Sequence, residues 1–413
     1  MSEAIQPTND PYSIALEDIN VADPGLFMAD NHWGYFDRLR KEAPVHYCRD
    51  SVVGPFWSVT KFNDIMEIEK NHEVFSSEGT ITLGDRPPNF NTDNFIGMDP
   101  PKHDVQRLAV TGVVAPTNLA KLEPIIRERV GNIMDNLPVG EEFNWVEHVS
   151  IELTTQMLAT LFDFPFEDRR KLTYWSDMAT SSELQGGPTP EADRQAALLE
   201  CLEVFTGLFN ERAHNDPMQA IDLITMMATN PDTKKMPPME FLGNLILLIV
   251  GGNDTTRNSI SGGVLFMNQF PEEFAKLKAN QALIPRAVSE IIRYQTPLAY
   301  MRRTAKRDYE FRGEQIREGD KVAMWYVSGN RDDEVLDDPY AFRVDRDNPR
   351  HHLSFGFGIH RCMGNRLAEM QLRIVWEEIL KRFEQLEVVG DPVRVQSFFV
   401  KGYEELPVIV HAR

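Results

Sequence analysis

The residue with the clearest chemical potential is Cys362, which lies in a glycine-rich loop just before a stretch of helical character. Backbone N–H groups at the start of a helix point outward and carry partial positive charge, so they stabilise a sulfur anion. Gly356, Gly358 and Gly364 lack the Cβ atom that would keep the backbone away from a large flat cofactor. These features favour a thiolate that is held in place and directed at a metal.

The loop follows the pattern Phe-x-x-Gly-x-His-x-Cys-x-Gly, which runs from Phe355 through His360 and Cys362 to Gly364. This pattern resembles the haem-binding signature of the cytochromes P450. The resemblance implies that Cys362 ligates the iron of haem b, with Phe355, Gly356 and Gly364 around the cofactor. A thiolate ligand donates electron density to iron and favours cleavage of the O–O bond, so the expected chemistry is oxygen activation.

A second group of residues that could take part in a reaction interrupts a long apolar stretch with helical periodicity over 237–268. Gly251, Gly252, Asp254 and Thr255 are poor choices inside a buried helix, because glycine costs roughly 1 kcal/mol relative to alanine and an unpaired carboxylate costs more. We expect the glycines to open the helix locally as a bulge or kink. The segment resembles the family's oxygen-activation motif, which implies that Thr255 hydrogen-bonds bound oxygen and Asp254 relays protons. The alternative is a helix stop followed by an N-cap aspartate that starts a second helix.

Cationic and imidazole side chains at separate places could bind the two propionate groups of haem. His103 and Arg107 stand four residues apart on one expected helix and match a propionate-binding pair of the family. Arg303 matches another such position, with Arg302 as the competing assignment, and His360 completes the set. Each of these residues alone is more often a surface charge, so the prediction depends on the set.

A structural pair is expected at Glu290 and Arg293, whose spacing places opposite charges on one helix face. It resembles the Glu-x-x-Arg pair of the family. In many relatives an arginine in a following Pro-x-x-Phe segment completes that network, but here Ala341 stands in its place. Arg343 and Arg346 are the candidates for the third partner, and the sequence leaves the choice open.

Helical periodicity dominates the chain, and strand-like alternation is confined to smaller parts. We expect a helix-rich core over about 103–294 and 363–383, and β-rich portions over about 44–60, 303–327 and 385–413. The individual helical stretches of the core are 103–135, 148–160, 166–182, 191–213, 217–228, 237–268 and 271–294. Residues 78–98 are polar and turn-rich, and are expected to form a loop. No linker or repeat divides the 413 residues, so we expect a single domain, mainly α with a minor β portion, which is the triangular-prism P450 fold that the resemblance implies.

Composition restricts the class of protein and its partners. The net charge of −20 argues against nucleic-acid binding, and three cysteines predict a reducing, cytoplasmic location. Cys48 and Cys201 lack the surroundings of Cys362 and are expected in the core. Three cysteines cannot supply a four-cysteine iron–sulfur cluster, and no dinucleotide-binding glycine motif is evident, so electrons must come from another protein. Residues 1–10 contain neither a basic start nor an apolar stretch, so we expect no signal peptide or membrane anchor.

From about residue 285 onward, several segments look like the soluble bacterial alkane terminal hydroxylases. These segments begin at Thr296, Met324, Asn348 and Gly402. The resemblance implies O₂-dependent hydroxylation of the terminal C–H of medium-chain alkanes or related linear substrates such as fatty acids. It also implies ferredoxin and ferredoxin reductase as the electron donors. Three arginines near Cys362 would form a basic patch that docks an acidic carrier, namely Arg350, Arg361 and Arg366.

The expected lining of the substrate pocket is apolar and comes from four parts of the chain. Its members are Ile81, Leu83, Leu248, Gly251, Leu298, Ala299, Met301, Phe399 and Val400. A narrow apolar tunnel would present only the end of a linear chain to the iron. The weaker C–H bonds next to the chain end would then be kept out of reach by geometry. The alternatives are hydroxylation of a terpenoid, steroid or other bulky apolar substrate, and a non-catalytic haem-binding sensor. The Asp254-Thr255 pair argues against the sensor, because binding alone needs no proton relay.

Overall fold

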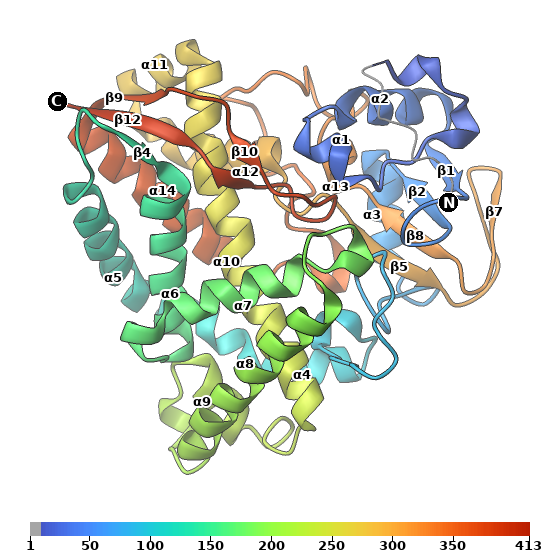
Figure 1. Cartoon of the computed structure of the whole chain (residues 1–413), viewed down its shortest axis with the longest axis horizontal. Helices are drawn as coiled ribbons and strands as arrows, with labels where there is room; N and C mark the ends of the chain where they lie inside the picture. The colour runs from blue at the N-terminus through green and yellow to red at the C-terminus, as the bar shows by residue number, and fades with distance from the viewer. Residues whose placement is uncertain (1–9) are drawn as a thin grey trace.

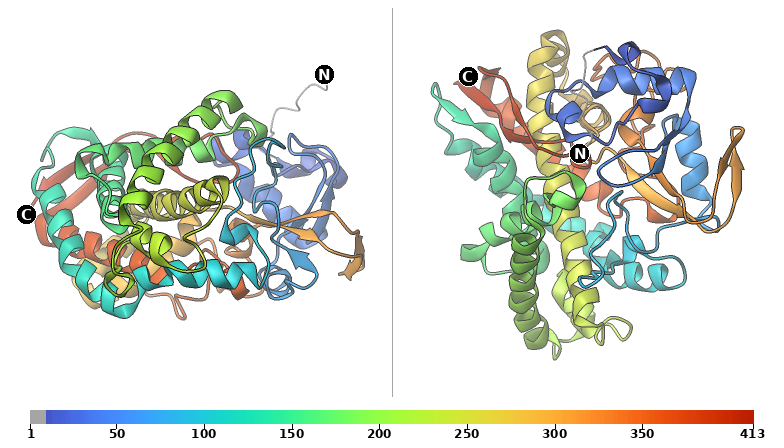
Figure 2. Two further views of the ribbon diagram at one scale, coloured as in Figure 1. Left: turned by 90° about the horizontal axis from the view of Figure 1, so that it is seen from below. Right: turned by 45° about the vertical axis from the view of Figure 1, so that its right-hand side comes forward.

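The computed structural model describes residues 10–413, so most of the N-terminal stretch considered above lies outside it. Helices predominate over strands, as expected, and the outline is roughly triangular (Figure 1; Figure 2 gives two further views). The helices are α1 (Pro24–Met28), α2 (His32–Glu42), α3 (Phe62–Lys70), α4 (Lys102–Thr111), α5 (Pro116–Asp135), α6 (Glu152–Phe162), α7 (Arg170–Thr180), α8 (Glu191–Arg212), α9 (Leu223–Thr229), α10 (Pro238–Gln269), α11 (Pro271–Ala279), α12 (Ile284–Gln295), α13 (Tyr326–Gly329) and α14 (Asn365–Arg382). The strands are β1 (Val45–Cys48), β2 (Phe56–Val59), β3 (Phe75–Ser76), β4 (Glu142–Asn144), β5 (Met301–Ala305), β6 (Tyr309–Phe311), β7 (Glu314–Ile316), β8 (Lys321–Met324), β9 (Phe383–Val388), β10 (Val393–Arg394), β11 (Tyr403–Glu405) and β12 (Pro407–Ala412).

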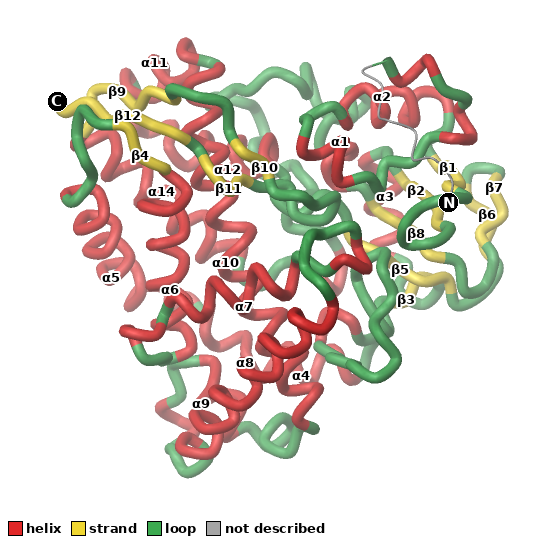
Figure 3. The backbone as a smooth tube through the Cα atoms, viewed as in Figure 1, coloured by secondary structure: helices red, strands yellow, loops and turns green. Residues whose placement is uncertain are grey.

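The strands gather in two places, with most of the helices between and below them (Figure 3). One sheet has the order β1-β2-β8-β5-β3, and another has the order β4-β12-β9. In the first sheet β2 and β8 run parallel, whereas the other neighbours are antiparallel. Strands from the N-terminal and C-terminal parts of the chain therefore share one sheet, and β5 of that sheet carries the two adjacent arginines considered above.

Helix α10 is central and packs against α6, α7, α8, α12 and α14. Pro238 occupies its first turn, where the missing N–H costs nothing, and Pro271 follows its end. The helix is α-helical from end to end, so it contains no bulge at Gly251 and Gly252, while the kink stays a prediction. Close packing accounts for Gly252, because a Cβ there would lie 2.8 Å from a methyl carbon of Leu158 on α6.

Two of the long helices expected from periodicity are each divided in two. A 3-10 turn over Gly112–Val114 separates α4 from α5, which starts at Pro116. Asn280 separates α11 from α12 in the same way, because its side chain accepts the backbone N–H of Ala282 and starts a new turn. Periodicity alone does not reveal such breaks, since the apolar stripe continues on both sides of the turn.

Cys48 and Cys201 are both buried with free thiols, as expected of core cysteines. Within residues 10–413, no helix combines the length and the apolar character that crossing a bilayer requires.

Candidate active site

The loop that carries Cys362 is closed on itself and joined to α14. The backbone N–H of Cys362 donates to the carbonyl oxygen of Phe355 at 2.8 Å, and Gly364 is the N-cap of α14. Gly358 has a φ of +68°, and a Cβ there would lie 2.5 Å from the carbonyl oxygen of Glu69 at the end of α3. Contact with α3 thus requires this glycine, and Gly358 is not among the residues that line the cavity.

The side chain of Cys362 opens onto an internal cavity of about 340 Å³. Burial raises the pKa of its thiol, while the backbone N–H of Gly364 and the charge of Arg107 act in the opposite direction. The N–H groups at the start of α14 therefore do face the sulfur, as the position of the cysteine before a helix predicts.

Six of the nine predicted pocket residues line this cavity: Ile81, Leu248, Gly251, Leu298, Met301 and Phe399. Leu83, Ala299 and Val400 do not, and they belong to a hydrophobic core cluster beside the cavity. Ala299 follows a lining residue in extended chain, where neighbouring side chains point to opposite faces. Val400 follows Phe399 at a bend, in which the hydroxyl of Ser397 accepts the backbone N–H groups of both residues. Leu83 lies in a series of bends, and its N–H donates to the buried hydroxyl of Tyr300 at 3.0 Å.

One face of α10 forms a long wall of the cavity. Leu248, Gly251, Thr255 and Ser259 recur at intervals of three or four residues, which places them on a single side of the helix. The lining extends along α10 from Ile246 to Ser259, a distance of about 20 Å at the rise of an α-helix. The cavity is therefore elongated. At its wall the hydroxyl of Thr255 donates to the carbonyl oxygen of Gly251 at 2.9 Å.

Asp254 points away from the cavity wall and is fully buried against α7. One carboxylate oxygen lies 2.6 Å from Arg257, and the other accepts the hydroxyl of Ser176 at 2.9 Å. Arg257 also pairs at 2.7 Å with Asp177, whose side chain is half-exposed. Burial, opposed by the charge of Arg257, raises the pKa of Asp254 to about 6. A chain of polar groups thus links Asp254 to the surface.

Sequence reasoning missed these partners of Asp254. The spacing of Arg257, three residues after Asp254, could have revealed it as a neighbour on the same helix. Ser176 and Asp177 come from a different helix, and nothing in the local sequence indicates that they approach α10.

Arg303 lines the cavity and donates to Glu69 at 2.8 Å, whereas Arg302 is not among the lining residues. Arg302 pairs with Asp85 at 2.6 Å, because adjacent residues of β5 point to opposite faces of the sheet. The geometry therefore favours Arg303 over Arg302 as a ligand of anything bound in the cavity. Glu69, which fixes Arg303 in place, was not among the predicted residues.

His360 and Arg107 line the same region of the cavity, and His103 lies directly behind them. The rings of His103 and His360 are 4.4 Å apart. Both ring nitrogens of His360 and the Nε2 atom of His103 are buried without a hydrogen-bond partner among the described residues. Orphaned polar atoms at a cavity wall imply a polar ligand group, since such atoms are costly to leave unsatisfied. A flat cofactor with acidic substituents, held by the cysteine, fits this donor set.

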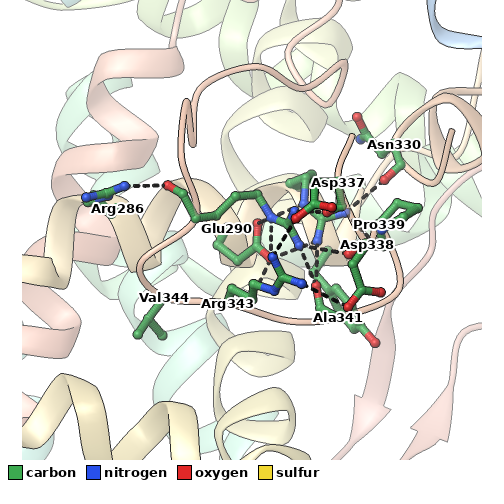
Figure 4. A network of polar contacts seen from close by, with 12 residues as sticks. Arg286, Glu290, Asn330, Asp337, Asp338, Pro339, Ala341, Arg343 and Val344 are labelled. Atoms are coloured by element: carbon green, nitrogen blue, oxygen red, sulfur yellow. Dashed lines mark hydrogen bonds and ion pairs between the residues drawn. The ribbon is translucent and has the colours of Figure 1, made fainter. Parts of the chain in front are cut away.

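Glu290 and Arg293 are buried on α12 and form a network with the chain that follows β8 (Figure 4). Arg293 donates to both carboxylate oxygens of Glu290, at 2.8 and 2.7 Å, and Arg346 donates to the same carboxylate at 2.9 Å. Although burial would raise the pKa of Glu290, these arginines lower it. Arg346 is thus the third partner, while Arg343 contributes only its backbone N–H. The carbonyl oxygen of Ala341 accepts from both Arg293 and Arg346.

Comparison with known proteins decides which family this site represents. Residues 191–399 match the family model described as cytochrome P450. Linalool 8-monooxygenase from Pseudomonas putida is 33% identical over 408 residues, which cover 96% of this chain and 99% of that protein. The chain belongs to the cytochrome P450 family. This P450 is a monooxygenase that uses haem b, and it requires O₂ and a redox partner.

Solved structures of other P450s have the same fold. Cytochrome P450-153 from Novosphingobium aromaticivorans is 43% identical with a TM-score of 0.89, and the match covers 95% of this P450 and 99% of that chain. CYP153D17 from a Sphingomonas species is 46% identical with a TM-score of 0.90, and the match covers 95% and 98% of the two chains. The predicted fold class and family are thereby confirmed.

Proposed function

We propose that this P450 hydroxylates the terminal C–H bond of medium-chain alkanes and related linear substrates. The observation that supports this proposal is the cavity that opens onto Cys362, which follows α10 for about 20 Å, including the part that the haem would fill. The lining includes apolar side chains, among them Leu248, Leu298 and Phe399. Such a cavity accommodates a linear chain end-on and so brings its terminal methyl group, rather than an internal methylene, to the reacting centre.

The proposed roles of the residues follow from their places at the cavity. Cys362 would ligate the iron, and four side chains would bind the propionates: His103, Arg107, Arg303 and His360. Phe355, Gly356 and Gly364 line the cavity beside the cysteine and would contact the cofactor. When bound, thiolate-ligated haem supplies the oxygen activation.

Two residues of α10 would manage protons. Thr255 holds a hydroxyl at the cavity wall, where it can give a hydrogen bond to oxygen in exchange for the one it gives to Gly251. Asp254, with a pKa of about 6, can take up and release protons near neutral pH. Arg257 and Asp177 would connect it to solvent.

The redox partner would be a ferredoxin that receives electrons from a ferredoxin reductase. Arg350, Arg361 and Arg366 are exposed around the cysteine loop, although Arg350 is partly neutralised by Glu369 at 2.8 Å. An acidic ferredoxin would be attracted to this patch despite the net charge of −20 on the whole chain.

The rival proposal is a bulky apolar substrate, because the relative at 33% identity is named for linalool, a terpenoid. A titration of the haem spin state distinguishes the two. Alkanes and fatty acids of rising length would be added to the purified holoenzyme, beside linalool and a steroid. We expect a saturable low-to-high-spin shift with linear chains that is strongest at one length. A shift only with the bulky compounds would leave the monooxygenase standing and overturn the terminal hydroxylation of linear chains.

A further inference from the structure

A buried carboxylate that has no role in the proposed chemistry lies behind Arg303. It belongs to Glu69 near the end of α3, whose side chain is only 1% exposed. Arg303 donates to this carboxylate through Nη2 at 2.8 Å, and the hydroxyl of Tyr326 also donates to it. Burying a carboxylate is costly unless it is both paired and hydrogen-bonded, and these two partners meet both conditions.

Glu69 also contacts the loop that carries Cys362. Helix α3 packs against the turn Gly358–His360 of that loop. The carboxylate of Glu69 lies 3.5 Å from the position that a Cβ of Gly356 would occupy, and its carbonyl oxygen lies 2.5 Å from the same position on Gly358. Because Gly356 lines the cavity onto which Cys362 opens, the negative charge of Glu69 is close to the wall of that cavity.

Arg303 lies between this carboxylate and the cavity, since it lines the cavity and Glu69 does not. Two of its N–H groups are used within the protein. One is donated to Glu69, and one, on Nη1, is donated to the carbonyl oxygen of Arg302 at 2.9 Å. A guanidinium carries five N–H groups, so the others are available to a ligand in the cavity. If that ligand is a haem propionate, Arg303 shares its charge between the propionate and Glu69.

The hydroxyl of Tyr326 remains a hydrogen-bond donor to the carboxylate. Burial, and after it the negative charge of Glu69, raises the pKa of Tyr326 well above its usual value, so the phenol keeps its proton. The hydrogen bond disperses part of the charge on the carboxylate and weakens its effect on the surroundings.

A fixed charge near haem changes the ease with which the iron accepts an electron from the redox partner. A negative charge favours the oxidised iron, which carries one more positive charge, whereas a cation favours the reduced iron. We propose that Glu69 helps to set the reduction potential of the haem iron, because its carboxylate partly neutralises Arg303 and keeps the potential below the value that Arg303 alone would give. This inference rests on the proposed role of Arg303 as a propionate ligand, and it is independent of which substrate is hydroxylated.

The test is a spectroelectrochemical titration of the substrate-free holoenzyme, in which small mediators replace the redox partner. Glu69→Gln removes the charge and keeps the shape of the side chain. We expect the ratio of reduced to oxidised haem at a fixed applied potential to rise about tenfold, which is a positive shift of about 59 mV for one electron. Glu69→Asp keeps the charge and should titrate close to the unmodified enzyme. Asp64→Asn is the matched control, because Asp64 is a buried carboxylate on the same helix that pairs with Arg312 at 2.6 Å and does not line the cavity.

A second variant keeps the buried ion pair, so it does not depend on whether the protein tolerates the loss of that pair. Tyr326→Phe removes only the hydroxyl and leaves the charge of Glu69 less dispersed. It should therefore lower the ratio of reduced to oxidised haem, by about threefold. A general loosening of the haem site would not move the two variants in opposite directions. An unchanged potential in Glu69→Gln, an equal shift in Asp64→Asn, or a potential in Tyr326→Phe that rises or stays the same would overturn the role of Glu69.

The premise about Arg303 is tested separately by the rate at which haem leaves the protein for an excess of apomyoglobin. Arg303→Gln should release haem about tenfold faster, because a charge-assisted hydrogen bond to a propionate is lost. Unchanged release would overturn both the binding of a propionate by Arg303 and the role of Glu69 that rests on it. Terminal hydroxylation would stand in that case, since it is tested by the spin-state titration with linear chains.

Discussion

The charge of Asp254 depends on its contacts with α7. Its pKa in the folded protein, about 6, lies above the value of about 3.9 for an unfolded chain, chiefly because of burial. The group therefore contributes a stability that is fully present below the unfolded pKa and is lost as the pH rises through about 6. At neutral pH the charged form of the carboxylate is stabilised by Arg257 and by the hydroxyl of Ser176.

Replacement of Ser176 with alanine should raise the pKa of Asp254 further, because that hydroxyl favours the charged form. We expect the coupling of product formation to electron consumption to change at a pH about one unit higher than in the unmodified enzyme. The measurement is a pH profile of product formed per electron consumed. Ser176→Thr keeps a hydroxyl and should restore the original profile. An unchanged profile in Ser176→Ala would show that Ser176 does not position Asp254.

At the scale of elements, α12 is joined to the segment that precedes the cysteine loop through Glu290. The two arginines that the sequence could not distinguish have opposite environments. Arg346 is buried and donates to Glu290 through its side chain, whereas the side chain of Arg343 turns outward to Asp337 and Asp338. Only Arg346 therefore holds α12 to this segment through its side chain.

Arg346→Ala should destabilise the protein by about 3–5 kcal/mol, because it leaves the carboxylate of Glu290 buried with one partner fewer. Arg343→Ala should cost less than about 1 kcal/mol, since its exposed ion pairs contribute little and its backbone N–H bond to Glu290 remains. Urea unfolding followed by the helical circular dichroism signal measures both. Similar losses in the two variants would refute the assignment of Arg346.

The sequence was sufficient to predict chemistry and local structure where these depend on residues close together in the chain. Sequence patterns predicted three features: the cysteine loop, the long helix around Thr255, and the pair of Glu290 and Arg293. Contacts between residues far apart in the sequence could not be predicted in this way. Whether the side chain of Ala299 points into the cavity or away from it depends on how the extended backbone is rotated. The approach of Glu69 to Arg303 depends on which strands meet in one sheet.

At the scale of the whole molecule, charge is unevenly distributed. The chain carries a net charge of −20, yet three exposed arginines, Arg350, Arg361 and Arg366, lie close in sequence to Cys362, where we propose that the electron carrier docks. Attraction between this patch and an acidic carrier acts at a distance, so it would raise the rate of encounter more than the strength of the complex. Arg366 is an exposed member of the patch on the first turn of α14.

Arg366→Glu should slow reduction of the haem by an acidic ferredoxin about tenfold at low salt, because it reverses one charge in the docking surface. Stopped-flow reduction at increasing ionic strength measures the rate, and the difference from the unmodified enzyme should shrink as salt rises. Arg317→Glu is the control, since Arg317 is also exposed but lies beside the β6–β7 hairpin, where it pairs with Asp308. An equal effect of the two variants would exclude a localised docking patch.

The contacts of Glu69 bear on how the chain reaches its final state during synthesis. This residue receives hydrogen bonds from Arg303 and Tyr326, which follow it by 234 and 257 residues, and its carbonyl lies against Gly358 still later. Contacts between such distant residues form slowly, because a long loop must close before they contribute stability. A nascent chain that lacks its last fifty or so residues already contains α3, Arg303 and Tyr326 but not Cys362, so the support of the cysteine loop can be in place before the loop is complete.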